Sequence, residues 1–397
     1  MKYDFDEVID RHNTGSSKWD NVGPRVGNPD ALPMWVADTD FRCPQPVVDA
    51  VIKRLQHPIY GYPFVTPDFY EATTEWVEKR HGWKLDPKWL VFATGIVPVF
   101  NTMIQALSEE GDKIIISRPV YHPFGFAVED NHREISDNSL IYENGHYSID
   151  FEDLERRAKD PKAKLMIVSS PHNPVGRAWT EEELYKISKI CSDNGVVIIC
   201  DEIHSDLMLY GHKHIPMGML GDEKMQKNII TCYAPSKTFN CAGLRASAVV
   251  VPDEKLRDML NKRFKMNRSI QQNITAIPAL VAAYRECEDY LEQLLPYLEK
   301  NVDFLRDYLK EKMPKIHLVE PEATYLMWLD CSGLGISGDE LADFIIQDCQ
   351  VAVSRGDGFG QEGKNFIRLN IGCPTSTLKM GLDRIYEQYK RDLYKLL

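Results

Sequence analysis

Apolar runs and amphipathic segments alternate along the chain between residues 90 and 251. Residues 196–200 and 229–233 are apolar at consecutive positions, a pattern typical of strands buried on both faces. Amphipathic stretches separate these runs at the spacing of α/β units. The pattern predicts a mostly parallel central sheet covered by helices, with strands at 91–93, 113–117, 164–169, 196–200, 229–233 and 246–251 and helices after Gly95, from about Pro123 and at 180–194.

The pattern changes on both sides of this region. Long amphipathic helices are predicted at 254–264, 274–285 and 290–312, and the last is long enough to bridge two domains. A smaller α+β part follows, with strands at 323–329, 351–354 and 366–371 and helices at 338–347 and 376–392; before residue 90, helices are predicted at 46–55 and 68–81. We therefore expect a large α/β domain at residues 51–288 and a small α+β domain formed by residues 1–50 and 289–397.

Composition narrows the functional class. The net charge of −12 and a pI near 5.5 argue against a nucleic-acid-binding surface. The charged first residues lack the apolar core of a signal peptide, and no apolar run reaches membrane-spanning length. Nine irregularly spaced cysteines indicate free thiols in a reducing compartment and no zinc-site spacing. We expect a cytoplasmic enzyme without a metal centre.

Lys237 is the first candidate for chemistry. It lies in the segment A-P-S-K-T-F-N-C-A-G-L-R (234–245), directly after the predicted strand 229–233. The end of a buried strand can present an amine to a cleft, as a lysine that forms a Schiff base requires. A solvated surface lysine is the alternative that this segment alone leaves open.

Four further polar or aromatic side chains follow predicted strands or lie within them. Asp201 follows one buried strand, Asn173 lies in the turn S-P-H-N-P-V-G (170–176), Tyr121 follows another strand, and Arg368 lies inside an apolar strand. Taken singly, each residue is also compatible with a structural role as a cap, a turn former, a core ring or half of an ion pair. The Thr-Gly step at Gly95, before a helix, suits a phosphate but is weak evidence alone.

Together these residues match the needs of pyridoxal phosphate (PLP). That cofactor requires a lysine, a carboxylate at its ring nitrogen, a donor to its phenolate oxygen, a ring against its face and donors for its phosphate. The order Asn173, Asp201, Ser236-Lys237, Arg245 and Arg368 resembles the fold-type I PLP enzymes of the class I/II aminotransferase superfamily, over essentially the whole chain.

Within that superfamily the chain resembles the PatB/MalY-type cystathionine β-lyases, which are carbon–sulfur lyases. The segments that carry this resemblance are W-V-A-D-T-D-F (35–41), Y-G-Y (60–62), D-E-I-H-S-D (201–206), S-K-T-F-N (236–240) and R-L-N-I-G-C-P (368–374). The lysine motif differs from that of the trans-sulfuration cystathionine lyases.

The resemblance implies a role for each residue. Lys237 holds PLP as a Schiff base and removes the Cα proton, and Asp201 keeps the ring nitrogen protonated. Arg368 binds the substrate carboxylate with support from the backbone of Ala37, while His204 lies beside the cofactor. The remaining implied contacts are Asn173 to the phenolate oxygen, Tyr121 stacked on the ring, and Gly95, Ile96, Ser236, Arg245 and the Tyr62 of a second subunit around the phosphate.

The implied activity is C–S β-elimination from cystathionine or cysteine S-conjugates, by a homodimer with shared active sites. An aminotransferase is the first alternative, because it needs the same lysine, aspartate and arginine. A PLP-sensing transcription regulator is the second, but it requires a DNA-binding module, and no such module precedes Trp35.

Overall fold

A computed structural model describes residues 1–268 and 270–393. In this part of the chain, seven strands form the main sheet in the order β2-β10-β9-β8-β7-β3-β4. Only β10 runs antiparallel to its neighbours, so the predicted mostly parallel sheet is confirmed. The strands are β2 (Leu90–Ala93), β3 (Lys113–Ile116), β4 (Glu134–Asp137), β7 (Ala163–Ser169), β8 (Val197–Asp201), β9 (Ile229–Tyr233) and β10 (Ser247–Val250).

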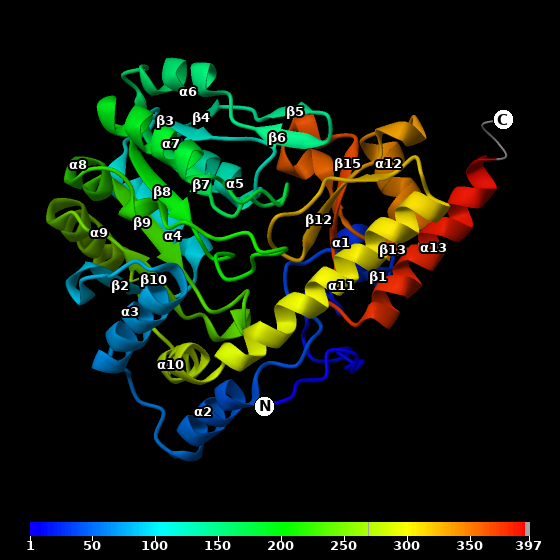
Figure 1. The fold of residues 1–397 in the computed structure, drawn as a ribbon. Coiled ribbons are helices and arrows are strands. Elements are labelled where there is room, and N and C mark those ends of the chain that lie inside the picture. The colour runs from blue at the N-terminus through cyan, green and yellow to red at the C-terminus, as the bar shows by residue number, and fades with distance from the viewer. Residues whose placement is uncertain (269, 394–397) are drawn as a thin grey trace.

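Helices cover both faces of this sheet, which explains the strands that are apolar at every position (Figure 1). In β8, Ile199 faces one core while Ile198 and Cys200 face the other. The first core receives side chains from α4 (Ile96–Leu107), α5 (Pro123–Asp130) and α9 (Glu254–Asn267), and the second from α6 (Phe151–Ala158) and α7 (Glu181–Asp193). Consecutive side chains of a strand point to opposite faces, so both must be apolar here.

A second, four-stranded sheet has the order β11-β12-β15-β14. The helix α11 (Glu288–Lys312) runs from α10 beside the large sheet to α13 beside the small one, as the yellow helix of Figure 1 shows. A separate parallel pair, β1 with β13, joins residues near the N-terminus to the C-terminal part. The elements involved are β1 (Leu32–Pro33), α10 (Ala276–Glu286), β11 (His317–Leu318), β12 (Leu326–Asp330), β13 (Val351–Ala352), β14 (Ser354–Arg355), β15 (Phe366–Asn370) and α13 (Thr375–Leu393).

Some elements differ from the predictions. The strand predicted at 351–354 is divided between two sheets, because β13 pairs with β1 and β14 pairs with β15. The strand predicted from residue 323 begins at Leu326, after Thr324 adopts a left-handed conformation with φ of 73°. The helix predicted at 338–347 changes from α12 (Asp339–Asp343) to π-helix over Phe344–Asp348.

Other elements lie in regions without a strong periodic pattern. These are α1 (Val22–Val26), the hairpin β5 (Ile141–Glu143) and β6 (His146–Ser148), and α8 (Glu223–Lys227), together with β4 and α6 named above; the predicted helices near the N-terminus are α2 (Gln45–Gln56) and α3 (Pro67–His81). No helix in the described residues is long and apolar enough to cross a membrane, and all nine cysteines are free. The domain limits at residues 50 and 289 stay a prediction.

Candidate active site

The parallel strands bring the predicted residues to one edge of the large sheet. Strands β2, β3, β7, β8 and β9 run in the same direction, so their carboxyl ends meet at this edge. Asp201 is the last residue of β8, and Lys237 follows four residues after β9. Arg368 reaches the same place from β15 of the small sheet. The edge therefore combines an amine, a carboxylate and a guanidinium.

Lys237 is held by the backbone of a segment 200 residues earlier. Its Nζ donates a hydrogen bond to the carbonyl oxygen of Ala37 over 2.6 Å. Burial lowers the pKa of Lys237 to about 8, and the positive charge of Arg368 adds to this effect, while Asp38 and Asp201 oppose it. A larger fraction of neutral amine than in an exposed lysine is therefore present near neutral pH.

Asp201 is a buried carboxylate without a strong partner. One of its oxygens accepts a 3.3 Å hydrogen bond from the backbone N–H of Ile203, and within the described residues it forms no ion pair. Burial raises the pKa of Asp201 to about 7, although the Ile203 N–H and the charge of Lys237 act in the opposite direction. Such a carboxylate gains stability from a cationic N–H placed against it.

Arg368 has the features of an anion receptor. Nη1 donates to Oδ1 of Asn173 over 2.9 Å, and Nη2 donates to the Trp35 carbonyl over 3.0 Å and to Oγ of Ser354 over 3.1 Å. Its buried Nε has no hydrogen-bond partner among the described residues, and no carboxylate there pairs with it. Burial lowers the pKa of Arg368 to about 10, so an incoming carboxylate would satisfy both the charge and the unpaired donor.

Tyr121, Asn173 and His204 complete the buried group. The backbone N–H of Tyr121 donates to the Asn173 carbonyl over 3.0 Å. Burial raises the pKa of Tyr121, and the nearby positive charge of Arg368 opposes this rise. His204 is buried, its Nδ1 has no hydrogen-bond partner among the described residues, and burial together with Lys237 lowers its pKa. We conclude that His204 is neutral at pH 7.

The residues predicted to surround a phosphate differ in exposure, from buried to fully exposed. Gly95, with φ of 117°, precedes the first residue of α4, Ile96, so a helix N-terminus points toward this edge. Ser236 is half-buried beside Lys237, whereas Arg245 is exposed in a left-handed conformation. Tyr62 is 105% exposed. The structure thus brings together Lys237, Ala37, Asp201, Asn173, Tyr121, His204 and Arg368, and it leaves Tyr62 on the surface of the monomer.

Several residues at the site were not predicted. The hydroxyl of Tyr325 donates to the Ala37 carbonyl over 3.2 Å, on the same oxygen that Lys237 contacts. The guanidinium of Arg368 lies 4.8 Å from the centre of the Phe359 ring. The negative charge of Asp38 raises the pKa of Lys237 and so opposes the effect of burial. Two acids after an apolar run were a visible signal for Asp38, but Tyr325 and Phe359 carry no local signal.

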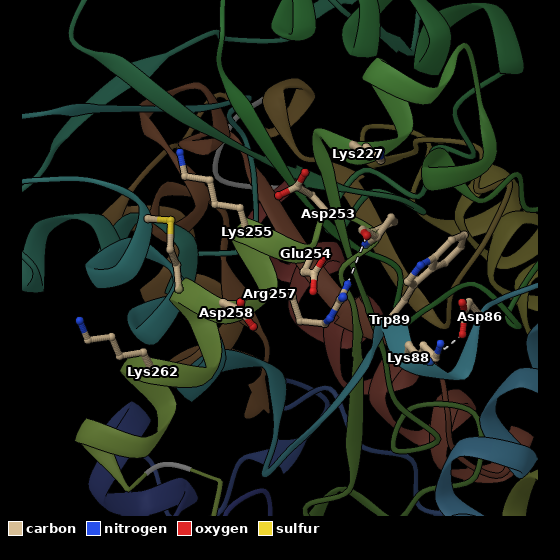
Figure 2. A pocket seen from close by; sticks show the side chains of 12 residues that line it. Asp86, Lys88, Trp89, Lys227, Asp253, Glu254, Lys255, Arg257, Asp258 and Lys262 are labelled. Carbon is tan, nitrogen blue, oxygen red and sulfur yellow. Dashed lines mark hydrogen bonds between the residues drawn. The ribbon is translucent and has the colours of Figure 1, made fainter.

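A surface hollow lies away from this edge of the sheet. Figure 2 shows this cavity of about 820 Å³, between Trp89 at the start of β2 and the first turns of α9. Basic and acidic side chains both line it, and Arg257 is engaged with the carbonyls of Val251 and Pro252. None of the predicted site residues contributes to its lining. Within the described residues, no group of three or more His, Cys, Asp or Glu side chains is arranged to hold a metal ion.

Comparison with known proteins identifies the family. The family described as aminotransferase class I and II matches residues 37–385. The chain belongs to the class I and II aminotransferase family. The predicted superfamily and fold class are thereby confirmed.

A curated protein and a solved structure are similar to this chain over nearly its whole length. Cystathionine beta-lyase PatB of Bacillus subtilis is 43% identical over 383 residues, which cover 96% of this chain and 98% of that protein. The structure of cystalysin from Treponema denticola, which contains PLP, has a TM-score of 0.95 at 32% identity and covers 98% of this chain and 100% of that one. The predicted similarity to PatB/MalY-type lyases is confirmed.

A third relative carries a different description. The PLP-bound putative aminotransferase of Clostridium difficile has a TM-score of 0.95 at 43% identity and covers 98% of this chain and 100% of that one.

The residues of this chain fit PLP. A ring N–H⁺ would meet the carboxylate of Asp201, which has no ion pair among the described residues, and an aldehyde would meet the half-buried amine of Lys237. The N-terminus of α4 after Gly95 can receive a phosphate, because Gly95 leaves the approach open and the helix is 12 residues long. A single ligand would thus partner both the carboxylate of Asp201 and the amine of Lys237.

Proposed function

We propose that this protein is a PLP-dependent carbon–sulfur β-lyase that cleaves cystathionine or cysteine S-conjugates to a thiol, pyruvate and ammonia. The observation that carries this proposal is the half-buried amine of Lys237, which bonds the Ala37 carbonyl and whose pKa of about 8 is affected by the charges of both Asp201 and Arg368. The relationship to PatB supports the lyase reaction, because that protein, described as a cystathionine beta-lyase, is 43% identical over 96% of this chain.

The cofactor would be held by residues from several strands. Lys237 would bind it covalently, Asp201 would hold its ring nitrogen, Asn173 would contact its phenolate oxygen and Tyr121 would lie on its ring. We propose that its phosphate is received by Gly95, Ile96, Ser236 and Arg245, with His204 beside the ring. Bound PLP supplies an electron sink for negative charge at the substrate Cα.

The protein side chains would bind, orient and move protons. Arg368 would bind the substrate carboxylate, which replaces the missing partner of its buried Nε, with the backbone of Ala37 alongside. The neutral amine of Lys237 would take the Cα proton, and the low pKa that burial produces favours this base. The bond between Cβ and sulfur would then break, and the thiolate would leave as the thiol after it takes up a proton. Water would hydrolyse the remaining three-carbon enamine to pyruvate and ammonia.

We further propose a homodimer in which Tyr62 contacts the phosphate bound by the other subunit. Tyr62 belongs to an exposed apolar surface that also contains Ile59, Tyr60 and Phe64, with exposures between 62% and 105%. Large exposed apolar surfaces of this kind mark interfaces. The free cysteines support a reducing compartment, and we propose the cytoplasm.

A steady-state assay of the PLP-loaded protein tests the proposed reaction. Cystathionine, cysteine and S-methylcysteine should each be compared with an amino acid plus 2-oxoglutarate. We expect pyruvate, ammonia and thiol to form in equal amounts from the sulfur substrates, without any 2-oxoacid acceptor. Turnover that requires 2-oxoglutarate and releases no thiol would instead identify an aminotransferase, the description given to the Clostridium difficile relative.

A further inference from the structure

Five consecutive backbone carbonyls beside the candidate site are each bound by side-chain donors. They belong to residues 35–39, the first part of a segment that we call the carbonyl strap (residues 35–41). The donors include the two residues central to the proposed reaction: Lys237 bonds the Ala37 carbonyl over 2.6 Å and Arg368 bonds the Trp35 carbonyl over 3.0 Å. The strap therefore contacts the amine and the guanidinium at the same time.

Two asparagines hold the strap on either side of Ala37. Asn370, two residues after Arg368, donates through Nδ2 to the carbonyls of Val36 and Asp38 over 2.6 and 2.7 Å. Asn240, three residues after Lys237, donates to the carbonyls of Thr39 and Phe41 over 3.0 and 2.8 Å. Its Oδ1 also accepts the Thr39 N–H over 3.2 Å.

The far side of the strap is fixed by a buried ion cluster. Asp40 accepts hydrogen bonds from Lys18 over 2.8 Å, from Arg11 over 2.7 Å and from the indole of Trp19 over 2.9 Å. Lys18 is 1% exposed, which is rare for a lysine and requires a paired charge. The strap thus has little freedom to shift away from the site.

We propose that Asn240 and Asn370 are positioning residues that set the distance between the Lys237 amine and the Arg368 guanidinium through the carbonyl strap. Arg368 would bind the substrate carboxylate and Lys237 would remove the proton from the adjacent Cα, so the spacing of the two must match one amino-acid backbone. This inference rests on the proposed function.

The two asparagines act on different ends of this arrangement. Asn240 is close in sequence to Lys237, and its loss should misplace the base without removing the carboxylate anchor. Asn370 is close to Arg368, and its loss should misplace the anchor. A displacement of about 1 Å in a catalytic group can cost on the order of 100-fold in rate.

The test uses Asn240→Gly, Asn370→Ala and the double variant in the PLP-loaded protein. Asn240 has φ of 52°, which glycine adopts freely, so this substitution removes the carboxamide without straining the backbone. The matched control is Asn144→Gly, since Asn144 has the same φ of 52° in the exposed turn between β5 and β6.

We expect Asn240→Gly to lower kcat by roughly 10- to 100-fold with a small change in KM, and Asn370→Ala to raise KM more than it lowers kcat. The double variant should lose less in kcat/KM than the product of the two single losses, because both act through one segment. Asn144→Gly should match the wild type.

A second readout does not depend on turnover. Amide hydrogen exchange of the cofactor-free protein should accelerate at residues 35–41 in both asparagine variants and stay unchanged in Asn144→Gly. Unchanged exchange at the strap, or faster exchange with wild-type kcat and KM, would overturn the inference. Failure of the wild type to release thiol would instead reject the proposed function, while hydrogen exchange still reports on the strap.

Discussion

At the scale of single residues, the site combines a buried carboxylate and a half-buried amine whose charged forms are both disfavoured. Burial raises the pKa of Asp201 to about 7 and lowers that of Lys237 to about 8. The two charges attract each other, yet they do not form an ion pair within the described residues. The cofactor-free fold therefore carries a cost at these positions, which a ligand with a cationic ring nitrogen and an aldehyde would relieve.

The cost at Asp201 predicts a specific pH dependence of stability. The native carboxyl has a pKa of about 7 against an unfolded value near 3.8, so the native state binds more protons between these values. The free energy of unfolding of the cofactor-free protein should therefore fall as the pH rises from about 4 to 7. Asn at this position cannot ionise, and Asp201→Asn should be more stable above pH 7 by at most roughly 4 kcal/mol, at about 1.36 kcal/mol per pKa unit.

Urea denaturation of both cofactor-free proteins at pH 4, 6 and 8 measures this difference. It should shrink to within about 1 kcal/mol at pH 4, because the native carboxyl is protonated there and the unfolded one, with a pKa near 3.8, is only about half ionised. Asp193→Asn is the control, because Asp193 is exposed and its neighbour Lys189 lowers its pKa. The control should gain no stability at pH 8, and an equal gain there, or none in Asp201→Asn, would contradict the assignment of Asp201 as a buried unpaired carboxylate.

At the scale of elements, the helices that cover the sheet are bounded by local chemistry. The helix α7, which follows β7 and precedes β8 in the chain, begins with a capping box. The hydroxyl of Thr180 accepts the Glu183 N–H over 3.2 Å, and the Glu183 carboxylate accepts the Thr180 N–H over 2.8 Å. Arg177 also pairs with Glu183 over 3.1 Å. The cap therefore anchors the helix to the turn that contains Asn173.

Removal of this cap should cost stability without touching the active site. We expect Thr180→Ala to lower the free energy of unfolding by about 1 kcal/mol, because the Glu183 N–H loses its acceptor. Thr180→Ser keeps the hydroxyl and should retain most of the stability. Thermal or urea unfolding measures both, and equal losses in the two variants would show that the methyl group, not the cap, is responsible.

At the scale of the whole molecule, the chain crosses twice between the two sheets. The first residues pack on α11, where Phe5 contacts Phe41 and Tyr290, and β1 pairs with β13. The helix α11 then leads from the large sheet to the small one, to which β15 belongs. The Ala37 carbonyl, Lys237 and Arg368 come from three distant parts of the chain, so the site forms only when both sheets are assembled.

The proposed dimer predicts complementation between two defective variants. Tyr62→Ala should impair activity because the phosphate of the other subunit loses a contact, and Lys237→Ala should be inactive. Refolding the two in equal amounts would place an intact Lys237 and an intact Tyr62 in one site of each mixed dimer. We expect about a quarter of the wild-type activity, since half of the dimers are mixed and each has one intact site.

Activity of the mixture, measured as thiol release, checks this prediction. The control mixes Lys237→Ala with Arg368→Ala. This mixture would regain activity if one active site took Lys237 from one subunit and Arg368 from the other. The hydrogen-bonded route from Lys237 through the strap to Arg368 lies within one chain, so this control should stay inactive. Complementation in the control alone would reject the proposed sharing of sites.

Local sequence patterns were sufficient to determine most of the framework. Consecutive apolar residues located β8 and β9, and the polar residues that follow the strands pointed to Lys237, Asp201 and Asn173. The strand predictions are confirmed because strand burial is encoded within a few neighbouring residues, while the roles of the three side chains stay a prediction. Residues 134–158 did not show such a pattern, since β4, β5 and β6 are short and partly exposed.

Tertiary structure alone decided the contacts between distant segments. Neither the bond from Lys237 to Ala37, 200 residues apart, nor the role of Asn240 and Asn370 on the carbonyl strap leaves a periodic signal. The division of residues 351–355 between β13 and β14 likewise depends on which partner strand lies alongside. The sequence by itself determined the main strands and where the candidate side chains follow them; the distances and pKa values of these side chains follow from burial and from partners that only the folded chain brings together.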